Sequence, residues 1–142
     1  MKVRDIMTCP AIHVAPGESV EVAARTLAQY NIGALPVCTE EGKLCGVVTD
    51  RDMVTRCVAS GRQPSQTSVR DVMTSKVEPA QPDMDAAVAA HLMGRLQIRR
   101  LPVVENGKLC GMVSLGDLAK REDSIMDAAD ALSDISTGVT AW

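Results

Sequence analysis

The apolar residues of this chain follow two periods, and the same succession of periods occurs twice. Between residues 20 and 28 apolar side chains recur at helical spacing, and Ser19 stands where it can cap that helix. Apolar runs at 35–38 and 45–48 flank a polar turn, which is typical of a β-hairpin. The first copy therefore predicts, in order, a short extended stretch at 12–14, a helix from 20 that ends at Asn31–Gly33, the two strands, and a helix from Met53 to about Ala59.

The second half of the chain repeats the first. Val-Arg-Asp-Ile-Met-Thr at residues 3–8 returns as Val-Arg-Asp-Val-Met-Thr at 69–74, and Gly-Lys-Leu-Cys-Gly at 42–46 returns unchanged at 107–111. A repeat at fixed spacing indicates that one structural unit was duplicated. The second copy predicts a helix at 85–95, strands at 101–105 and 109–113, and a helix opened by residues 114–117. Each copy reads β-α-β-β-α, so we expect an α/β protein of two pseudo-symmetric halves.

This repeat divides the chain into a first motif at 1–62, a second motif at 63–121 and an acidic C-terminal tail at 122–142. Half of 142 residues is marginal for an independent core, so we expect the two halves to share one core. Acidic and basic residues balance up to residue 118, and the remainder of the chain supplies the net charge of −3. Residues 123–133 are compatible with an acidic helix, and Trp142 with docking on a partner subunit or a disordered end.

Composition and charge exclude several classes of function. Nucleic-acid binding requires a basic face with stacking aromatics, but the chain has no Phe and only Tyr30 and Trp142 as aromatics. No apolar run approaches membrane-spanning length and no signal-peptide pattern opens the chain, so we expect a cytoplasmic protein away from the membrane. The five cysteines form no Cys-x-x-Cys pair, and apolar packing is favoured over a redox or metal role. His13 and His91 lie at non-equivalent positions, and we predict no metal or catalytic role for them.

One constellation has the residue types of a binding site. Both copies carry Gly, two apolar residues, Thr or Ser, two free positions and Asp, at 46–52 and at 111–117. A hydroxyl at the start of a helix lies among unpaired backbone N–H groups that accept phosphate, and a carboxylate three residues later can accept hydrogen bonds from ribose hydroxyls. Thr-x-x-Asp is also a capping box, in which the same two side chains satisfy backbone donors. The pattern alone does not decide between these readings.

These repeated segments resemble tandem CBS motifs that form a Bateman module, over about residues 3–121. The chain is similar to stand-alone bacterial CBS-pair proteins, which carry no catalytic domain, so the resemblance implies a non-enzymatic sensor of an adenosine-containing ligand such as AMP, ADP or ATP. The ligand would bind in a cleft between the two motifs. The resemblance implies ribose contacts from Asp52 and Asp117, phosphate contacts from Thr49, Ser114, Arg99 and Arg100, and an adenine slot lined by Val47, Met112, Ile12 and Val77.

The two copies differ beside this shared turn. Arg99 and Arg100 stand where the first copy has Gly33 and Ala34, and arginine offers forked donors suited to phosphate. We expect them to reach a ligand at Asp52 from the other repeat, or else to form a solvated basic pair. Glu78 departs from the resemblance, because it stands where the family has an apolar residue.

The expected partners follow from the same resemblance. Related CBS pairs form disk-like dimers through their helices, so we expect a homodimer that acts on an effector protein not encoded here. The alternative is a structural or protein-interaction module with vestigial clefts. An enzyme is the weakest option, because no nucleophile-elbow, P-loop or dinucleotide-binding pattern occurs.

Overall fold

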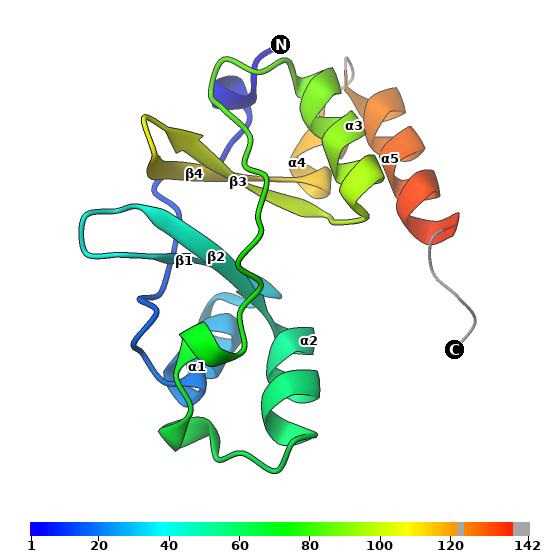
Figure 1. The fold of residues 1–142 in the computed structure, drawn as a ribbon. Coiled ribbons are helices and arrows are strands. Elements are labelled where there is room, and N and C mark those ends of the chain that lie inside the picture. Colours follow the sequence, from blue (N-terminus) through cyan, green and yellow to red (C-terminus); the bar gives the residue numbers. More distant parts are fainter. Residues whose placement is uncertain (122–123, 138–142) are drawn as a thin grey trace. The chain divides into compact units, whose positions relative to one another are not determined.

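The computed structural model describes residues 1–121 and 124–137, which divide into two compact units (Figure 1). The first-repeat unit comprises Ile12–Val77 and Gly107–Leu109. The second-repeat unit comprises Met1–Ala11, Glu78–Asn106 and the described residues from Cys110 onward. In the described residues no helix is long and apolar enough to cross a membrane.

The first-repeat unit has the predicted succession of elements. Helix α1 (Val20–Tyr30) leads to the antiparallel strands β1 (Ala34–Cys38) and β2 (Leu44–Thr49), followed by α2 (Asp50–Met53). The predicted extended stretch at 12–14 is reduced to a single parallel bridge between Val14 and Val37. The helix predicted at 53–59 starts at Asp50 in the structure, as α2. It continues after Met53 as the π-helical turn η2 (Val54–Val58).

Local chemistry explains the ends of α1. The Ser19 side chain accepts a hydrogen bond from the backbone N–H of Val22, so the predicted cap is confirmed. Asn31 has φ 53° and lies in the left-handed region, where Asn is tolerated at a helix end. The turn after Asn31 then directs the chain into β1.

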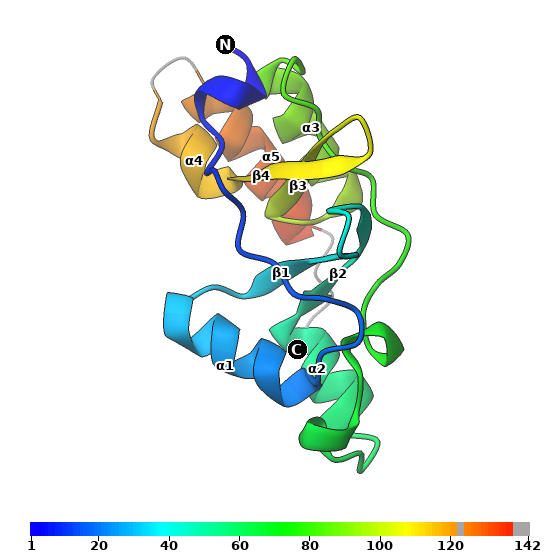
Figure 2. The same cartoon turned by 90° about the vertical axis from the view of Figure 1, so that its left-hand side faces the viewer.

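The second-repeat unit has the same order. Helix α3 (Ala86–Leu96) is followed by the paired strands β3 (Arg100–Glu105) and β4 (Lys108–Ser114) and by α4 (Leu115–Ala119). An additional helix, α5 (Ile125–Thr137), lies beside α3 and α4 in both views (Figures 1 and 2). The α/β class with two copies of one element order is therefore confirmed, although the first strand of each copy is a single bridge, Val14 with Val37 and Ala80 with Val103.

Each unit is completed by a segment from the other copy of the repeat. Thr8 pairs with Met112 through two backbone hydrogen bonds, of 2.8 and 3.0 Å, and Val3 donates to Met84 at 2.8 Å. In the first-repeat unit the equivalent Thr74 pairs with Val47 in the same way, at 2.9 and 3.0 Å. The segments 3–8 and 69–74 have thus changed places, and the compact units do not follow the repeat boundaries.

The buried apolar residues form two clusters, one in each unit, so the expectation of a single shared core is wrong. The exchanged segments supply buried side chains to both, Val3 and Ile6 to one and Val69 and Val72 to the other. In the second-repeat unit α5 adds Ala128, Ala131 and Ile135. With these contributions, each unit has a larger apolar core than the residues of its own repeat could form alone. Trp142 lies outside the described residues.

Candidate functional site

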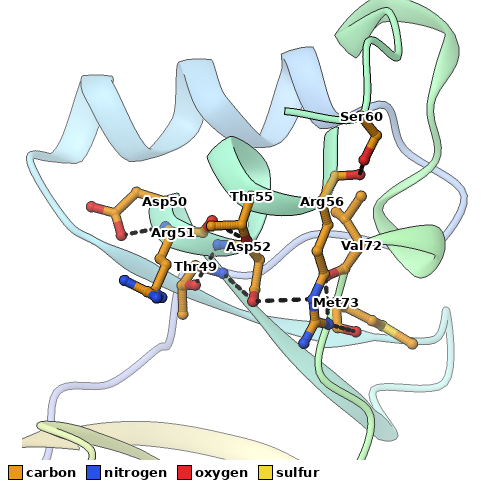
Figure 3. Close-up of polar contacts among 9 residues, drawn as sticks. All are labelled: Thr49, Asp50, Arg51, Asp52, Thr55, Arg56, Ser60, Val72 and Met73. Atoms are coloured by element: carbon orange, nitrogen blue, oxygen red, sulfur yellow. Dashed lines mark hydrogen bonds and ion pairs between the residues drawn. The ribbon is translucent and has the colours of Figure 1, made fainter. Parts of the chain in front are cut away.

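The predicted turn at Thr49–Asp52 lies at the junction of β2 and α2 (Figure 3). The Thr49 hydroxyl accepts from the Asp52 backbone N–H at 3.0 Å, and Asp52 Oδ2 accepts from the Thr49 backbone N–H at 3.0 Å. Asp52 is only 8% exposed, and its Oδ1 lies 3.9 Å from Arg56 Nε. The guanidinium of Arg56 also donates to the carbonyls of Val72 and Met73, each at 3.1 Å. Arg56 therefore ties this turn to the exchanged segment 69–74.

The turn at Ser114–Asp117 has the same geometry in the other unit. The Ser114 hydroxyl accepts from the Asp117 N–H at 3.1 Å, and Asp117 Oδ2 accepts from the Ser114 N–H at 2.8 Å. Arg121, four residues beyond Asp117 as Arg56 is beyond Asp52, instead donates to the carbonyl of Asp5 at 3.1 Å. The capping reading is thus correct for both turns. It leaves the other oxygen of each carboxylate for a further acceptor role, since a carboxylate has about four lone-pair sites.

The glycine that opens the shared motif is required by a close backbone approach. A Cβ on Gly46 would lie 2.6 Å from the carbonyl oxygen of Thr74. A Cβ on Gly111 would lie 2.9 Å from the carbonyl oxygen of Thr8. The sequence pattern contained this glycine, but its reason becomes visible only with the exchanged segments in place.

The other predicted site residues are distributed over both units. Val47, Thr49, Asp52, Val77 and Ile12 belong to the first-repeat unit, and Met112, Ser114, Asp117, Arg99 and Arg100 to the second. Val47 of β2 and Met112 of β4 are half-buried and lie two residues before the two turns. Their backbones pair with Thr74 and Thr8. Each unit therefore brings together its own turn and its own apolar neighbour, whereas the assignment of residues from one repeat to the cleft of the other stays a prediction.

Glu78, the departure from the expected pattern, has a partner in its own unit. Both of its carboxylate oxygens accept from the guanidinium of Arg95 on α3, at 3.1 and 3.0 Å. The pair is exposed, so its contribution to stability is small. Arg95 therefore offsets the negative charge of Glu78 within this unit.

Arg99 and Arg100 lie in the second-repeat unit at a pocket of about 520 Å³. Ser114 and Gly116 line the same pocket, at the junction of β4 and α4. Its remaining wall comes from α4 and from one face of α5. The sequence indicated the arginines, the serine and an acidic helix at 123–133, which corresponds to α5, but it did not indicate that this helix forms a wall of the pocket.

The cysteines are free thiols. Burial raises the pKa of Cys38 to about 11, and the neighbouring Cys45 contributes to the same shift. A protonated, buried thiol is a poor nucleophile and a poor metal ligand, so for Cys38 the structure favours the expected packing role. Among the described residues, no group of three or more His, Cys, Asp or Glu side chains is placed to hold a metal ion.

Comparison with known proteins places this geometry in a family. The family model described as "CBS domain" matches residues 3–59 and 69–124. The CBS domain-containing protein YhcV of Bacillus subtilis is 42% identical over 134 residues, which cover 94% of either chain. The CBS domain pair of protein MJ0100, solved in complex with 5-methylthioadenosine and S-adenosyl-L-methionine, superposes with a TM-score of 0.75 and 29% identity, covering 84% of this chain and 94% of that one. Hypoxic Response Protein I, solved with two coordinated zinc ions, gives a TM-score of 0.80 and 29% identity, covering 85% and 98%.

Proposed function

We propose that this chain, which belongs to the CBS-domain family, is a non-enzymatic regulatory module that binds an adenosine-containing ligand of the AMP, ADP or ATP type in a cleft between its two motifs. The observation that carries the proposal is the turn that occurs twice with the same geometry. In both turns a hydroxyl and a carboxylate three residues apart are fixed by reciprocal hydrogen bonds. The related MJ0100 pair supports the choice of ligand class, because both of its ligands contain adenosine.

The capping bonds and ligand binding are compatible. Each Asp uses Oδ2 for the backbone and keeps a second oxygen, which can accept from a ribose hydroxyl. We take Asp52 as the first ribose site, with Thr49, Arg99 and Arg100 toward the phosphates and Val47 and Val77 toward the adenine. The second site would use Asp117 and Ser114 in the same roles, with Met112 and Ile12 toward the adenine.

Titration calorimetry with AMP, ADP, ATP and S-adenosylmethionine tests this function. We expect at least one of them to bind, and Asp52→Ala to weaken that binding at least tenfold through the lost ribose contact. Asp50→Ala is the matched control, since Asp50 is an exposed carboxylate two residues away that bonds only to the Arg51 N–H among the contacts described. Absence of binding for all four ligands at millimolar concentration would refute the proposal.

The second candidate is a structural or protein-interaction module whose clefts are vestigial. The observation that favours it is that both carboxylates already satisfy a cap. In that case Asp52→Ala lowers stability by about 1 kcal/mol through the lost cap, and the unmodified protein binds no adenine nucleotide. The cap is present whichever function holds, so the loss in urea unfolding is expected in both cases and the titration above separates the two functions.

The proposed assembly is a homodimer that transmits the bound state to an effector protein. Exposed apolar side chains on the helices of the first-repeat unit support it, with Val54 58% and Val58 61% exposed. Native mass spectrometry of the purified protein measures the oligomer mass and any retained nucleotide together. A purely monomeric mass at micromolar concentration would exclude the dimer.

A further inference from the structure

The pocket of the second-repeat unit has a cationic end and an apolar wall. We propose that it binds a small anionic amphiphile, a phosphate or carboxylate carried on an apolar body, between the start of α4 and the face of α5. This site shares Arg99 and Arg100 with the proposed function but requires neither Asp52 nor Asp117. The pocket has a volume of about 520 Å³, which lies within the roughly 300–1,000 Å³ typical of small-molecule sites.

The cationic end consists of two adjacent arginines. Arg99 and Arg100 are exposed, and in residues 1–121 and 124–137 no side-chain hydrogen bond or ion pair engages either guanidinium. None of the described residues that line the pocket is acidic. Two unpaired guanidinium groups in the lining therefore offer forked donors, and such donors match the oxygens of phosphate and carboxylate.

The apolar wall belongs to α5. Ile125, Ala129 and Leu132 line the pocket and recur at the spacing of one helix face. Ile125 is 50% exposed and Leu132 is 42% exposed, although the adjacent face of α5, with Ala128, Ala131 and Ile135, is buried. Exposed aliphatic side chains beside two arginines suit a ligand that has an apolar part and an anionic part.

The first repeat provides an internal comparison. At the positions of Arg99 and Arg100 it has Gly33 and Ala34, and at the position of Leu115 it has Asp50. A Cβ on Gly33 would lie 3.5 Å from Asp50 Oδ2, so a carboxylate stands where the second repeat has an apolar side chain and two cations. The same location in the first repeat would repel an anion, and the proposed site is therefore particular to the second.

The site also depends on residues beyond the CBS motif. The family match ends at residue 124, and α5 begins at Ile125. The start of α5 is fixed to α4 through the buried Ser124, whose hydroxyl donates to the carbonyl of Leu118. A ligand that contacts both α4 and α5 would further stabilise this docking.

Calorimetric titration with n-octyl phosphate below its micellar concentration tests the inference, with inorganic phosphate and 1-octanol as the two half-ligands. We expect octyl phosphate to bind at least tenfold more tightly than either half. The double variant Arg99→Gln/Arg100→Gln should weaken octyl phosphate at least tenfold, whereas Lys120→Gln, a nearby exposed cation outside the lining, should not. Ile125→Ser should weaken it too, whereas Met126→Ser, which removes a 72% exposed apolar side chain outside the lining, should leave it unchanged.

Three outcomes would overturn the inference. One is equal affinity for octyl phosphate in all four variants. Another is its loss in Asp117→Ala, which would place the anion in the nucleotide site. The third is binding to phosphatidylglycerol vesicles that needs Arg99 and Ile125 while monomeric octyl phosphate does not bind, which would assign the face to a membrane surface. If octyl phosphate binds as expected and no adenine nucleotide does, only the proposed function fails.

Discussion

Replacing Gly46 by alanine adds one methyl group at the closest backbone approach in the first-repeat unit. The new Cβ would lie 2.6 Å from the Thr74 carbonyl oxygen and 3.0 Å from Met73 Sδ. The first distance is about 1 Å shorter than the roughly 3.5 Å at which nonbonded heavy atoms are in favourable contact. Met73 can move its flexible side chain, but Thr74 is fixed by its two hydrogen bonds to Val47.

The cost follows from that fixed backbone. Overpacking costs about 1–3 kcal/mol, and weakening the paired hydrogen bonds adds about 1 kcal/mol. We therefore expect Gly46→Ala to lower the free energy of unfolding by about 2–4 kcal/mol. For a chain of this size, that loss corresponds to a fall of about 5–15 °C in the midpoint of thermal unfolding.

Urea unfolding followed by circular dichroism measures this loss, and Gly116→Ala is the control. A Cβ on Gly116 meets only Ser114 Oγ, at 3.6 Å, and alanine favours the helix over glycine by about 0.5–1 kcal/mol. The control should be neutral or slightly stabilising. A Gly46→Ala variant within 0.5 kcal/mol of the unmodified protein would show that segment 69–74 does not lie against β2 as described (threshold of the order of typical surface substitutions).

Three further predictions concern α5, the caps and the thiols. Ala131→Asp places a carboxylate at a buried position and should increase amide hydrogen exchange across α5 at least tenfold, whereas the exposed Ser133→Asp should leave it unchanged. Thr49→Ala should cost about 1 kcal/mol in urea unfolding, because α2 loses the side-chain acceptor of its cap. At pH 8 iodoacetamide should modify the exposed Cys9 and spare the buried Cys38, as read by peptide mass spectrometry. Burial raises the pKa of Cys38 from 9.0 to about 11, so the folded state favours the protonated thiol. The stability that this protonated thiol contributes is full below pH 9 and is lost as the pH rises toward 11.

The sequence predicted the elements well because their signals are local. The cap at Ser19, the left-handed residue Asn31 and the polar turn between β1 and β2 each act within a few residues of their element. The exchange of segments 3–8 and 69–74 could not be predicted in this way. Both copies have nearly the same sequence, so either could occupy either place by its own residues, and only the packing of the chain distinguishes them.

The tail shows a second limit of sequence reasoning. The residues from 119 onward supply the whole net negative charge, and small apolar residues recur among them. Gly94 of α3 lies against α5, and its missing side chain lets α5 approach: a Cβ there would lie 2.9 Å from Asp134 Oδ2 and 3.4 Å from the Ala131 Cα. Gly94 lies in the last turn of α3, where a glycine weakens the helix, and its packing against α5 explains why it is there; this glycine was the available signal for a docked helix.

The two repeats are most alike at the residues that contact backbone atoms. Both keep the opening glycine, which lies close to a carbonyl oxygen, and both keep the hydroxyl and the carboxylate, which accept backbone hydrogen bonds. They differ at Arg99 and Arg100, at the Asp50 and Leu115 positions, and in the presence of α5 beside only one of them. If the two turns contact ribose and phosphate as proposed, they do so with the same groups, and a difference in affinity between the two clefts is then expected from these neighbours. Exchanging Gly33-Ala34 and Arg99-Arg100 between the copies should therefore alter the affinity of each cleft while leaving both caps, and the stability they provide, unchanged.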